Sequence, residues 1–238
     1  MSAERPNKKT ETSSVGMSAR WEERSASRVL EVGRDQILER SRQLVEAAYE
    51  LLENEGLDGL TIRAVLKNTG LSRRAFYERF AGKDDLMLAV FEHTILLAAR
   101  HYGEQVSELA DPMERLKLIV TSIVTGRNTQ ASERQQSSGH RGAAMSREHL
   151  RLAESRPDDL QLALEPLISL IAQLLSDGMK VGAIRNDDPR RMATLVYNLV
   201  STTVHTELLS QEGAQADQAH RQKLAEDIWE FCRRAIVA

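Results

Sequence analysis

The fold of this chain is decided by residues 61–86, TIRAVLKNTGLSRRAFYERFAGKDDL, which predict two short helices, a tight turn between them and the start of a third helix. Thr61 is an N-cap type of residue, and the apolar residues that follow it recur at helical spacing. Gly70 can take the left-handed conformation that ends a helix, and Ser72 can cap the next one. Two short helices joined by a glycine turn form the helix-turn-helix pattern, whose second helix enters the DNA major groove.

The second short helix has an apolar face and a polar face. Phe76 and Phe80 lie four residues apart, so both can face a core. The polar face carries the residues available to another surface, which are Arg73, Arg74, Tyr77 and Arg79. From Arg63 to Lys83 the chain has six cations and one acid, Glu78. The pattern alone leaves two interpretations open, a DNA-binding head and an ordinary helical hairpin whose arginines are solvated.

The composition is that of a helical protein with a substantial core. Of the 238 residues, 41% are hydrophobic, only 4% are aromatic and 5 are proline. Leu, Ala, Glu and Arg abound, which favours helix over sheet. The formal net charge of −3 does not itself indicate a nucleic-acid binder. A local basic face on an acidic chain nevertheless suits binding to particular sites rather than to any nucleic acid.

Several classes of function lack their sequence signals. The single cysteine, Cys232, has no intrachain partner and lies in an apolar helical stripe, and no CxxC or Cys/His cluster predicts a metal site. No GxSxG elbow, glycine-rich phosphate loop or His-x-x-Glu pair points to an enzyme or a cofactor. No apolar run approaches the ~20 residues that span a bilayer, and the N-terminus lacks the apolar core of a signal peptide. We therefore expect a cytoplasmic protein that is not an enzyme and has no metal or cofactor.

Residues 37–90 resemble the DNA-binding domain of the TetR family of transcriptional regulators. Three features carry the resemblance: a glycine-containing turn after the first helix (LLENEGLDGLT, residues 51–61), the turn Gly70-Leu71-Ser72, and an aromatic pair followed by a lysine (FYERFAGK, residues 76–83). The rest of the chain is similar to the family only in its length and helical character.

The resemblance implies an all-α fold, with an N-terminal three-helix DNA-binding domain that contains the helix-turn-helix and a C-terminal helical ligand-binding and dimerisation domain. The expected division is a flexible N-terminal arm over 1–33, the DNA-binding domain over 34–85 and the effector-binding and dimerisation domain over 86–238. The implied function is that of a homodimeric repressor, which binds a palindromic operator in double-stranded DNA and is released by a small-molecule effector.

The resemblance also assigns roles within the helix-turn-helix. Thr61, Tyr77 and Lys83 match family positions that contact phosphates, although Tyr77 could instead be half-buried packing. Arg73 and Arg74 lie in the first turn of the reading helix, where an arginine can bridge guanine O6 and N7 or merely contact a phosphate. The other expected DNA-binding residues are Arg63 and Ser72. Ala75 stands where the family often has Thr, and its methyl could meet thymine.

The remaining helices are predicted from periodicity and caps. The first helix should run from about Asp35 to Glu55, with an inner stripe that includes Ile37 and Leu44. Arg20, Arg24 and Arg28 recur every four residues, which suits a helical extension, a basic arm along DNA or a solvated tail. Further helices are expected at about 83–109, 112–125, 145–154, 157–175 with a kink at Pro166, 189–208 and 217–235, and a mobile loop at 126–142.

The helical domain offers candidates for an effector pocket and for a dimer interface. Inward-facing positions on two long helices predict a largely apolar pocket lined by His93, Leu97, His101, Leu167 and Ile171, although each histidine could instead be a core or surface residue. Broad apolar stripes on the last two helices, about 188–236, suit a monomer core or an intermolecular four-helix bundle. The resemblance favours the bundle. An alternative function is a helical DNA-associated interaction protein that acts through protein partners without a small-molecule ligand.

Overall fold

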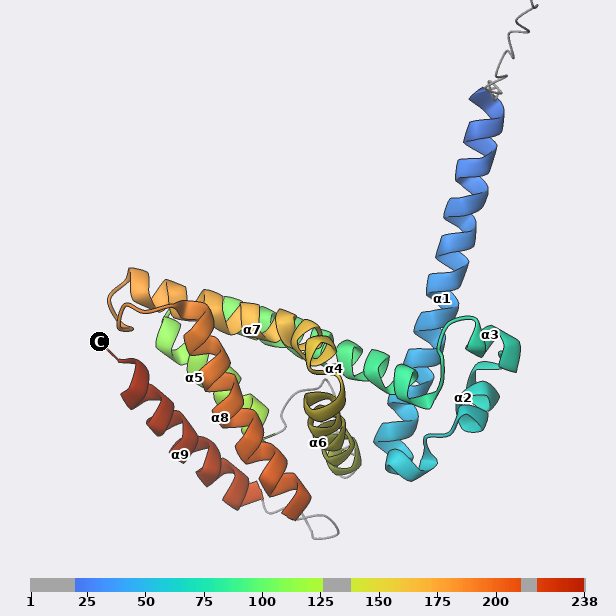
Figure 1. Ribbon diagram of the computed structural model, residues 1–238. Helices are drawn as coiled ribbons and strands as arrows, with labels where there is room; N and C mark the ends of the chain where they lie inside the picture. Colours follow the sequence, from blue (N-terminus) through green and yellow to red (C-terminus); the bar gives the residue numbers. More distant parts are fainter. Residues whose placement is uncertain (1–19, 126–137, 211–217, 238) are drawn as a thin grey trace, which may run out of the picture. The chain divides into compact units, whose positions relative to one another are not determined.

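The computed structural model describes residues 20–125, 138–210 and 218–237, and these ranges are almost entirely helical (Figure 1). The helices are α1 (Arg20–Gly59), α2 (Ile62–Thr69), α3 (Arg73–Tyr77), α4 (Lys83–Ser107), α5 (Pro112–Thr125), α6 (Ser138–Ser155), α7 (Pro157–Lys180), α8 (Pro189–Ser210) and α9 (Gln218–Ile236). The all-α fold class expected from the sequence is confirmed.

Helix α1 begins at Arg20, well before the predicted start at Asp35, so the segment with Arg20, Arg24 and Arg28 is the helical extension that their spacing allowed. The extra turns have a physical basis, because residues 20–32 contain neither glycine nor proline and include three Glu and three Arg, which favour helix. Gly56, at φ 69° and ψ −163°, breaks the helical path near the predicted end.

The chain divides into two units after Ser41, within α1. Ile37 was expected in the inner stripe, but its side chain is 53% exposed. Residues 1–19 of the predicted arm lie outside the described residues.

The head, which we define as residues 42–90, has its own apolar core. Helix α1 contributes one stripe to it, and α2, α3 and the start of α4 close over that stripe. Its most buried members are Leu44, Ala48, Leu52, Leu60, Val65, Phe76 and Val90, each with a fully covered side chain. The three-helix arrangement is therefore held by burial of apolar surface, since α2 and α3 are too short to be stable alone.

The body, which comprises the rest of α4 and helices α5 to α9, has a second and larger core. Helix α7 lies against α4, α5 and α8, and α9 packs on α5. Helix α7 is also the helix among the described residues that is long and apolar enough to cross a membrane. Its buried residues, from Leu160 to Gly178, nevertheless belong to this core, which identifies it as an interior helix. Cys232 is buried in the same core, and burial raises the pKa of its thiol to about 11.

Polar caps fix the starts of two body helices, α5 and α8, as the sequence predicts. The Asp111 carboxylate accepts a hydrogen bond from the Met113 N–H at 3.0 Å and starts α5. The Asp188 carboxylate accepts from Arg190 N–H at 2.9 Å and starts α8. Pro166 lies inside α7, where it removes the bond to the carbonyl of Leu162. The Leu162 side chain is 71% exposed, so water can reach this part of the helix surface.

Helix α6 also begins earlier than predicted, at Ser138 rather than near Met145. Most of the predicted loop over 126–142 lies outside the described residues. Helix α6 also touches both cores. Ala144, 1% exposed, belongs to the core of the head, and Met145 packs against both cores. Arg151 approaches Asp84, at the start of α4, to 3.9 Å, while it holds the buried carboxylate of Glu148 at 2.6 Å.

Candidate nucleic-acid interface

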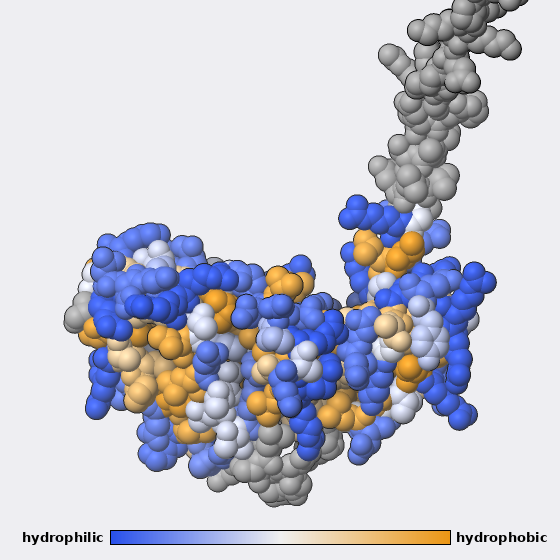
Figure 2. Space-filling view, in the orientation of Figure 1, coloured by the Kyte–Doolittle hydropathy of each residue, from blue (hydrophilic) through white to orange (hydrophobic). Residues whose placement is uncertain are grey.

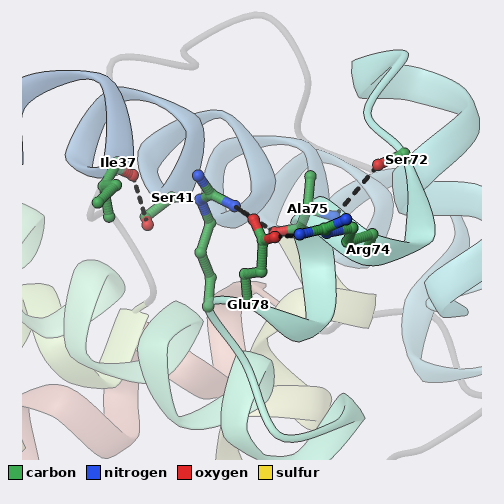
Figure 3. Close-up of polar contacts among 7 residues, drawn as sticks. Ile37, Ser41, Ser72, Arg74, Ala75 and Glu78 are labelled. Atoms are coloured by element: carbon green, nitrogen blue, oxygen red, sulfur yellow. Dashed lines mark hydrogen bonds and ion pairs between the residues drawn. The ribbon is translucent and has the colours of Figure 1, made fainter. Parts of the chain in front are cut away.

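The turn between α2 and α3 is built from short-range hydrogen bonds. The Thr61 hydroxyl accepts the N–H of Ala64 at 3.1 Å and caps α2. Gly70 ends α2 at φ 68°, a conformation that side chains other than glycine's rarely adopt, and its N–H donates to the Leu66 carbonyl at 3.0 Å. The Ser72 hydroxyl then accepts the N–H of Ala75 at 3.2 Å and caps α3 (Figure 3). These bonds confirm the helix-turn-helix and fix where α3 begins.

Helix α3 turns one face into the core of the head and the other to solvent. Phe76 is fully buried and Phe80 is 9% exposed, and their ring centroids lie 5.8 Å apart. Tyr77, on the other face, is 56% exposed. Its ring packs edge to face on Phe76 at a centroid distance of 5.2 Å, so the residue combines partial packing with an exposed surface. Ala75 corrects an expectation, because its methyl is only 8% exposed and cannot meet a thymine.

Arg74 is held by an acidic neighbour one turn later on the same helix. Its Nε donates to Glu78 Oε1 at 2.9 Å (Figure 3), and the side chains are 90% and 49% exposed. The hydrogen bond from Arg74 lowers the pKa of the Glu78 carboxyl, which therefore stays ionised at neutral pH. An ion pair between exposed side chains is weak in water, so the Arg74 guanidinium can exchange this carboxylate for a stronger anion.

Arg79 is the one cation of residues 63–83 that leaves the polar face. Its guanidinium folds back onto the helix, where Nη1 donates to the carbonyl of Ala75, and its side chain is only 6% exposed. The carbonyls in the last turn of a helix have no partner within the helix, and Arg79 satisfies one of them. Its Nε is buried without a hydrogen-bond partner. Of the six cations in residues 63–83, Arg79 is therefore not available to DNA.

All seven residues predicted to bind DNA have exposed side chains. They are Thr61, Arg63, Ser72, Arg73, Arg74, Tyr77 and Lys83. Lys83 lies at the start of α4, and its Nζ donates to the carbonyl of Leu57 at 3.3 Å, which holds it beside the end of α1. The local structure therefore gathers a phenol, two hydroxyls and four cations on the helix-turn-helix and its flanks, which suits contacts with phosphates and base edges.

The five residues predicted to line an effector pocket have different surroundings. Leu97 is 39% exposed, which corrects its assignment to an inward-facing position. Leu167 and Ile171 are buried in the body core. His93 meets the edge of the Tyr49 ring at 5.8 Å, and burial lowers its pKa. His101 lies beside Tyr102 at a centroid distance of 6.1 Å.

The body instead contains a cluster of polar rings that the sequence did not reveal. His149 of α6 lies between two residues of α8, with ring centroids 4.4 Å from His205 and 6.1 Å from Tyr197. Phe91 of α4 faces the His149 ring at 6.1 Å. The residues come from three helices that are distant in the chain. In the sequence, the only indication is that these histidines lie on the inner sides of amphipathic helices. That position does not show that they contact each other.

Comparison with known proteins finds a family match for the head. The family described as "Bacterial regulatory proteins, tetR family" matches residues 44–90, which contain the helix-turn-helix and the core that orients it. The head of this chain matches the TetR family. Members of the TetR family are transcriptional regulators and not enzymes.

Similarity to TetR regulators extends through the body at low sequence identity. The "Fatty acid metabolism regulator protein" of Bacillus subtilis is 20% identical over 174 residues, which span 71% of this chain and 84% of that protein. A TetR-family regulator from Pectobacterium atrosepticum has a similar structure, with a TM-score of 0.66, 17% identity and coverage of 86% of this chain and 97% of that one. The regulator FadR from Bacillus subtilis, solved with stearoyl-CoA, has a TM-score of 0.58 at 18% identity, with coverage of 80% and 96%. At these identities the likeness shows the fold alone.

Proposed function

We propose that this protein is a cytoplasmic, homodimeric transcriptional repressor that binds a palindromic operator and releases it when a small molecule binds in the body. The observation that carries the proposal is the placement of Arg73 and Arg74 at the exposed start of α3, whose opposite face is locked into the core of the head. A side chain must be held by a rigid element to read a base edge. The proposed division is an arm over 1–33, a DNA-binding domain over 34–85 and an effector and dimerisation domain over 86–238.

Two kinds of DNA contact follow from this placement. Thr61 caps α2, Tyr77 ends α3 and Lys83 begins α4, and all three would contact phosphates, which set the register of the protein on the duplex. Arg73 and Arg74 would enter the major groove at the start of the reading helix, where an arginine can bond guanine O6 and N7 together. Ser72 and Arg63 lie beside these contacts and add to the same surface.

The last two helices support the proposed dimer. Leu195 of α8 and Phe231 of α9 have side chains that are 63% and 64% exposed, although both helices pack into the body core. Figure 2 shows hydrophobic side chains among polar ones on the face of the body where α8 and α9 are in view. Phe is costly to leave in water, so a second copy of the chain is the proposed cover for this face. A two-fold axis here would present two heads to the two halves of an inverted repeat.

The effector would act through elements shared by the head and the body. Helix α4 gives Leu86 and Val90 to the core of the head and Phe91 and Tyr102 to the core of the body. Helix α6 contacts the head core through Ala144. A ligand that prefers one placement of these helices would shift the heads and thereby change the affinity for DNA, typically by 1–3 kcal/mol.

The proposed function is tested by selecting binding sites for the purified protein from random DNA duplexes at near-physiological salt. Recovery of an inverted repeat would support a dimeric sequence reader, and its half-site spacing should match one helical turn or a multiple of it. Recovery of salt-sensitive binding without a motif would overturn the proposal and favour a DNA-associated protein that acts through protein partners.

The phosphate contacts give a first prediction for variants of the head. Lys83→Ala should weaken binding to the selected operator and to unrelated DNA alike, and the slope of log K against log salt should fall by about 1. Tyr77→Phe should weaken both by a smaller factor without changing the slope, because the phenol is neutral. Fluorescence anisotropy on both duplexes between 50 and 200 mM salt measures this. A loss confined to the operator would remove these residues from the phosphate-binding set.

Base reading gives a second prediction, with the Arg74–Glu78 pair as an internal control. Arg73→Ala or Arg74→Ala should relax the preference at one base pair of each half-site by ~1–3 kcal/mol. Glu78→Gln removes the intramolecular partner of Arg74. It should tighten DNA binding without changing the preferred sequence. Competition between the operator and single-base variants gives the measurement. Unchanged selectivity at every position would assign that arginine to the backbone alone.

A further inference from the structure

The most unusual group of side chains outside the head is the ring cluster, which we define as His149, Tyr197 and His205. The two imidazoles meet edge to face at 4.4 Å, and the Tyr197 hydroxyl lies 3.5 Å from His149 Nδ1. Helix α6 supplies His149, and α8 supplies the other two residues two turns apart. Tyr197 is 5% exposed, whereas both imidazoles are only partly buried. The cluster therefore has a buried hydroxyl and two imidazoles that solvent or a ligand can reach.

The hydrogen-bonding capacity of these rings is largely unused. Within the described part of the chain, His205 has no hydrogen-bond partner, and His149 has only the long contact with Tyr197. A neutral imidazole carries one donor and one acceptor, so the pair has free polar atoms in an apolar setting. Both imidazoles are only partly buried, so these polar atoms are open to water or to a ligand that replaces it.

No anion among the described residues faces the imidazoles. Glu148, next to His149, is bound by Arg151 at 2.6 Å, and Glu207, two residues after His205, pairs with His220 at 2.8 Å. Tyr197 is the other titratable group of the cluster, and burial raises its pKa. Burial lowers the pKa of His149, and burial together with His149 lowers that of His205 to about 4. Both imidazoles are consequently neutral at pH 7, because nothing nearby compensates a positive charge.

We propose that the ring cluster binds the carboxylate of a small organic acid with an apolar body, an inference that rests on the proposed function because it names the effector's class. The carboxylate would accept the hydrogen bonds that the imidazoles and the Tyr197 hydroxyl can donate. Phe91 and the apolar core around α4, α6 and α8 would contact the rest of the ligand. A bound anion also supplies the charge that the pair lacks, so an imidazole would take up a proton on binding.

Proton uptake separates an acid from the other ligands that two imidazoles could hold. A neutral alcohol of the same shape can accept the same hydrogen bonds but gives no reason for a proton to bind. A metal ion would compete with protons instead, and the described residues place no three His, Cys, Asp or Glu side chains to hold one. An acid should therefore bind more tightly as pH falls below the bound-state pKa of the imidazole, until pH reaches its free value.

The test is calorimetric titration of the full chain, without DNA, using octanoate and benzoate against 1-octanol and benzyl alcohol. Each acid is expected to bind at least ten-fold more tightly than its alcohol and to gain affinity between pH 8 and pH 6. Comparing two buffers of different protonation enthalpy should give an uptake of up to one proton per site. Equal binding of acid and alcohol, or no binding of any acid at roughly 10 mM, would overturn the proposal.

Variants locate the site. His149→Phe and His205→Phe keep an aromatic ring and should each weaken binding of the acid at least ten-fold, and Tyr197→Phe should weaken it less. Glu154→Gln changes an exposed residue of the same α6 and should bind as the natural chain does. Circular dichroism and melting confirm that each variant is folded. Undiminished acid binding by both histidine variants would place the ligand elsewhere, and tight Ni²⁺ binding lost in them would make the pair a metal site.

The two tests together distinguish a failure of this proposal from a failure of the proposed function. Acid binding by a protein that selects no operator would leave the ring cluster as a ligand site and overturn the repressor. Operator selection by a protein that binds none of the acids would leave the repressor and overturn only the ligand class.

Discussion

Phe231→Glu combined with Leu195→Glu is expected to give a folded monomer that binds the complete inverted repeat at least about 10²-fold more weakly. When two heads are linked, binding of the second half-site follows that of the first at a high effective concentration. A monomer must bind each half-site separately, so this advantage disappears. The same double variant should bind a duplex with a single half-site as the natural chain does, because Arg73 and Arg74 are unchanged.

The size of the effect follows from the burial of the two side chains. Both are more than 60% exposed in the single chain, so a partner would remove most of their surface from water. Full burial of a Phe or Leu side chain contributes about 1.5–3 kcal/mol, and a two-fold interface contains each contact twice. A glutamate in the same place would bring an uncompensated charge into apolar surroundings, which costs more than the lost contact.

Leu162→Glu provides the matched control. Leu162 lies on α7 and is 71% exposed, more than either Leu195 or Phe231, yet it lies outside the last two helices. Sedimentation velocity should therefore show a dimer for Leu162→Glu and a monomer for the double variant. If the double variant sediments as a dimer, α8 and α9 do not form the interface. If Leu162→Glu is the monomer, the interface lies on α7.

The head could be predicted from the sequence because its signals are local. Thr61, Gly70 and Ser72 act on residues within one turn of themselves, and each cap forms as expected. Side-chain direction on α3 was less accessible to sequence reasoning. With only five residues, the helix has no long periodic pattern that would fix which positions face inward. Two positions therefore differ from the prediction. Ala75 is buried, and Arg79 folds back onto the Ala75 carbonyl instead of pointing to solvent.

Contacts between distant helices explain what the sequence could not predict about the body. The His149–His205 contact joins α6 and α8, and nothing near either residue in the chain indicates the other. The prediction that Leu97 faces inward was wrong for a related reason. Helix α4 has apolar residues on several sides, and it packs on the head at one end and on the body along its length. Periodicity finds the apolar side chains of such a helix, but it does not rank them by burial.

Phe76→Ala is expected to destabilise the head by about 3–5 kcal/mol, which is a large fraction of the stability of a typical domain. The ring is fully buried and lies 5.2 Å from Tyr77 and 5.8 Å from Phe80, so its removal leaves a cavity under α3.

The consequence for DNA binding follows from the length of α3. A five-residue helix is not stable alone, and its direction depends on the ring that anchors it. Phe76→Ala should therefore abolish operator binding while the body stays folded. Hydrogen exchange should accelerate in α2 and α3 and remain unchanged in α7, and thermal melting should show an early loss of part of the helix signal. Tyr77→Ala is the control, because its exposed side chain should leave exchange unchanged while DNA binding weakens. Retention of operator binding by Phe76→Ala would mean that the Ser72 cap and the Gly70 turn are enough to position the reading helix.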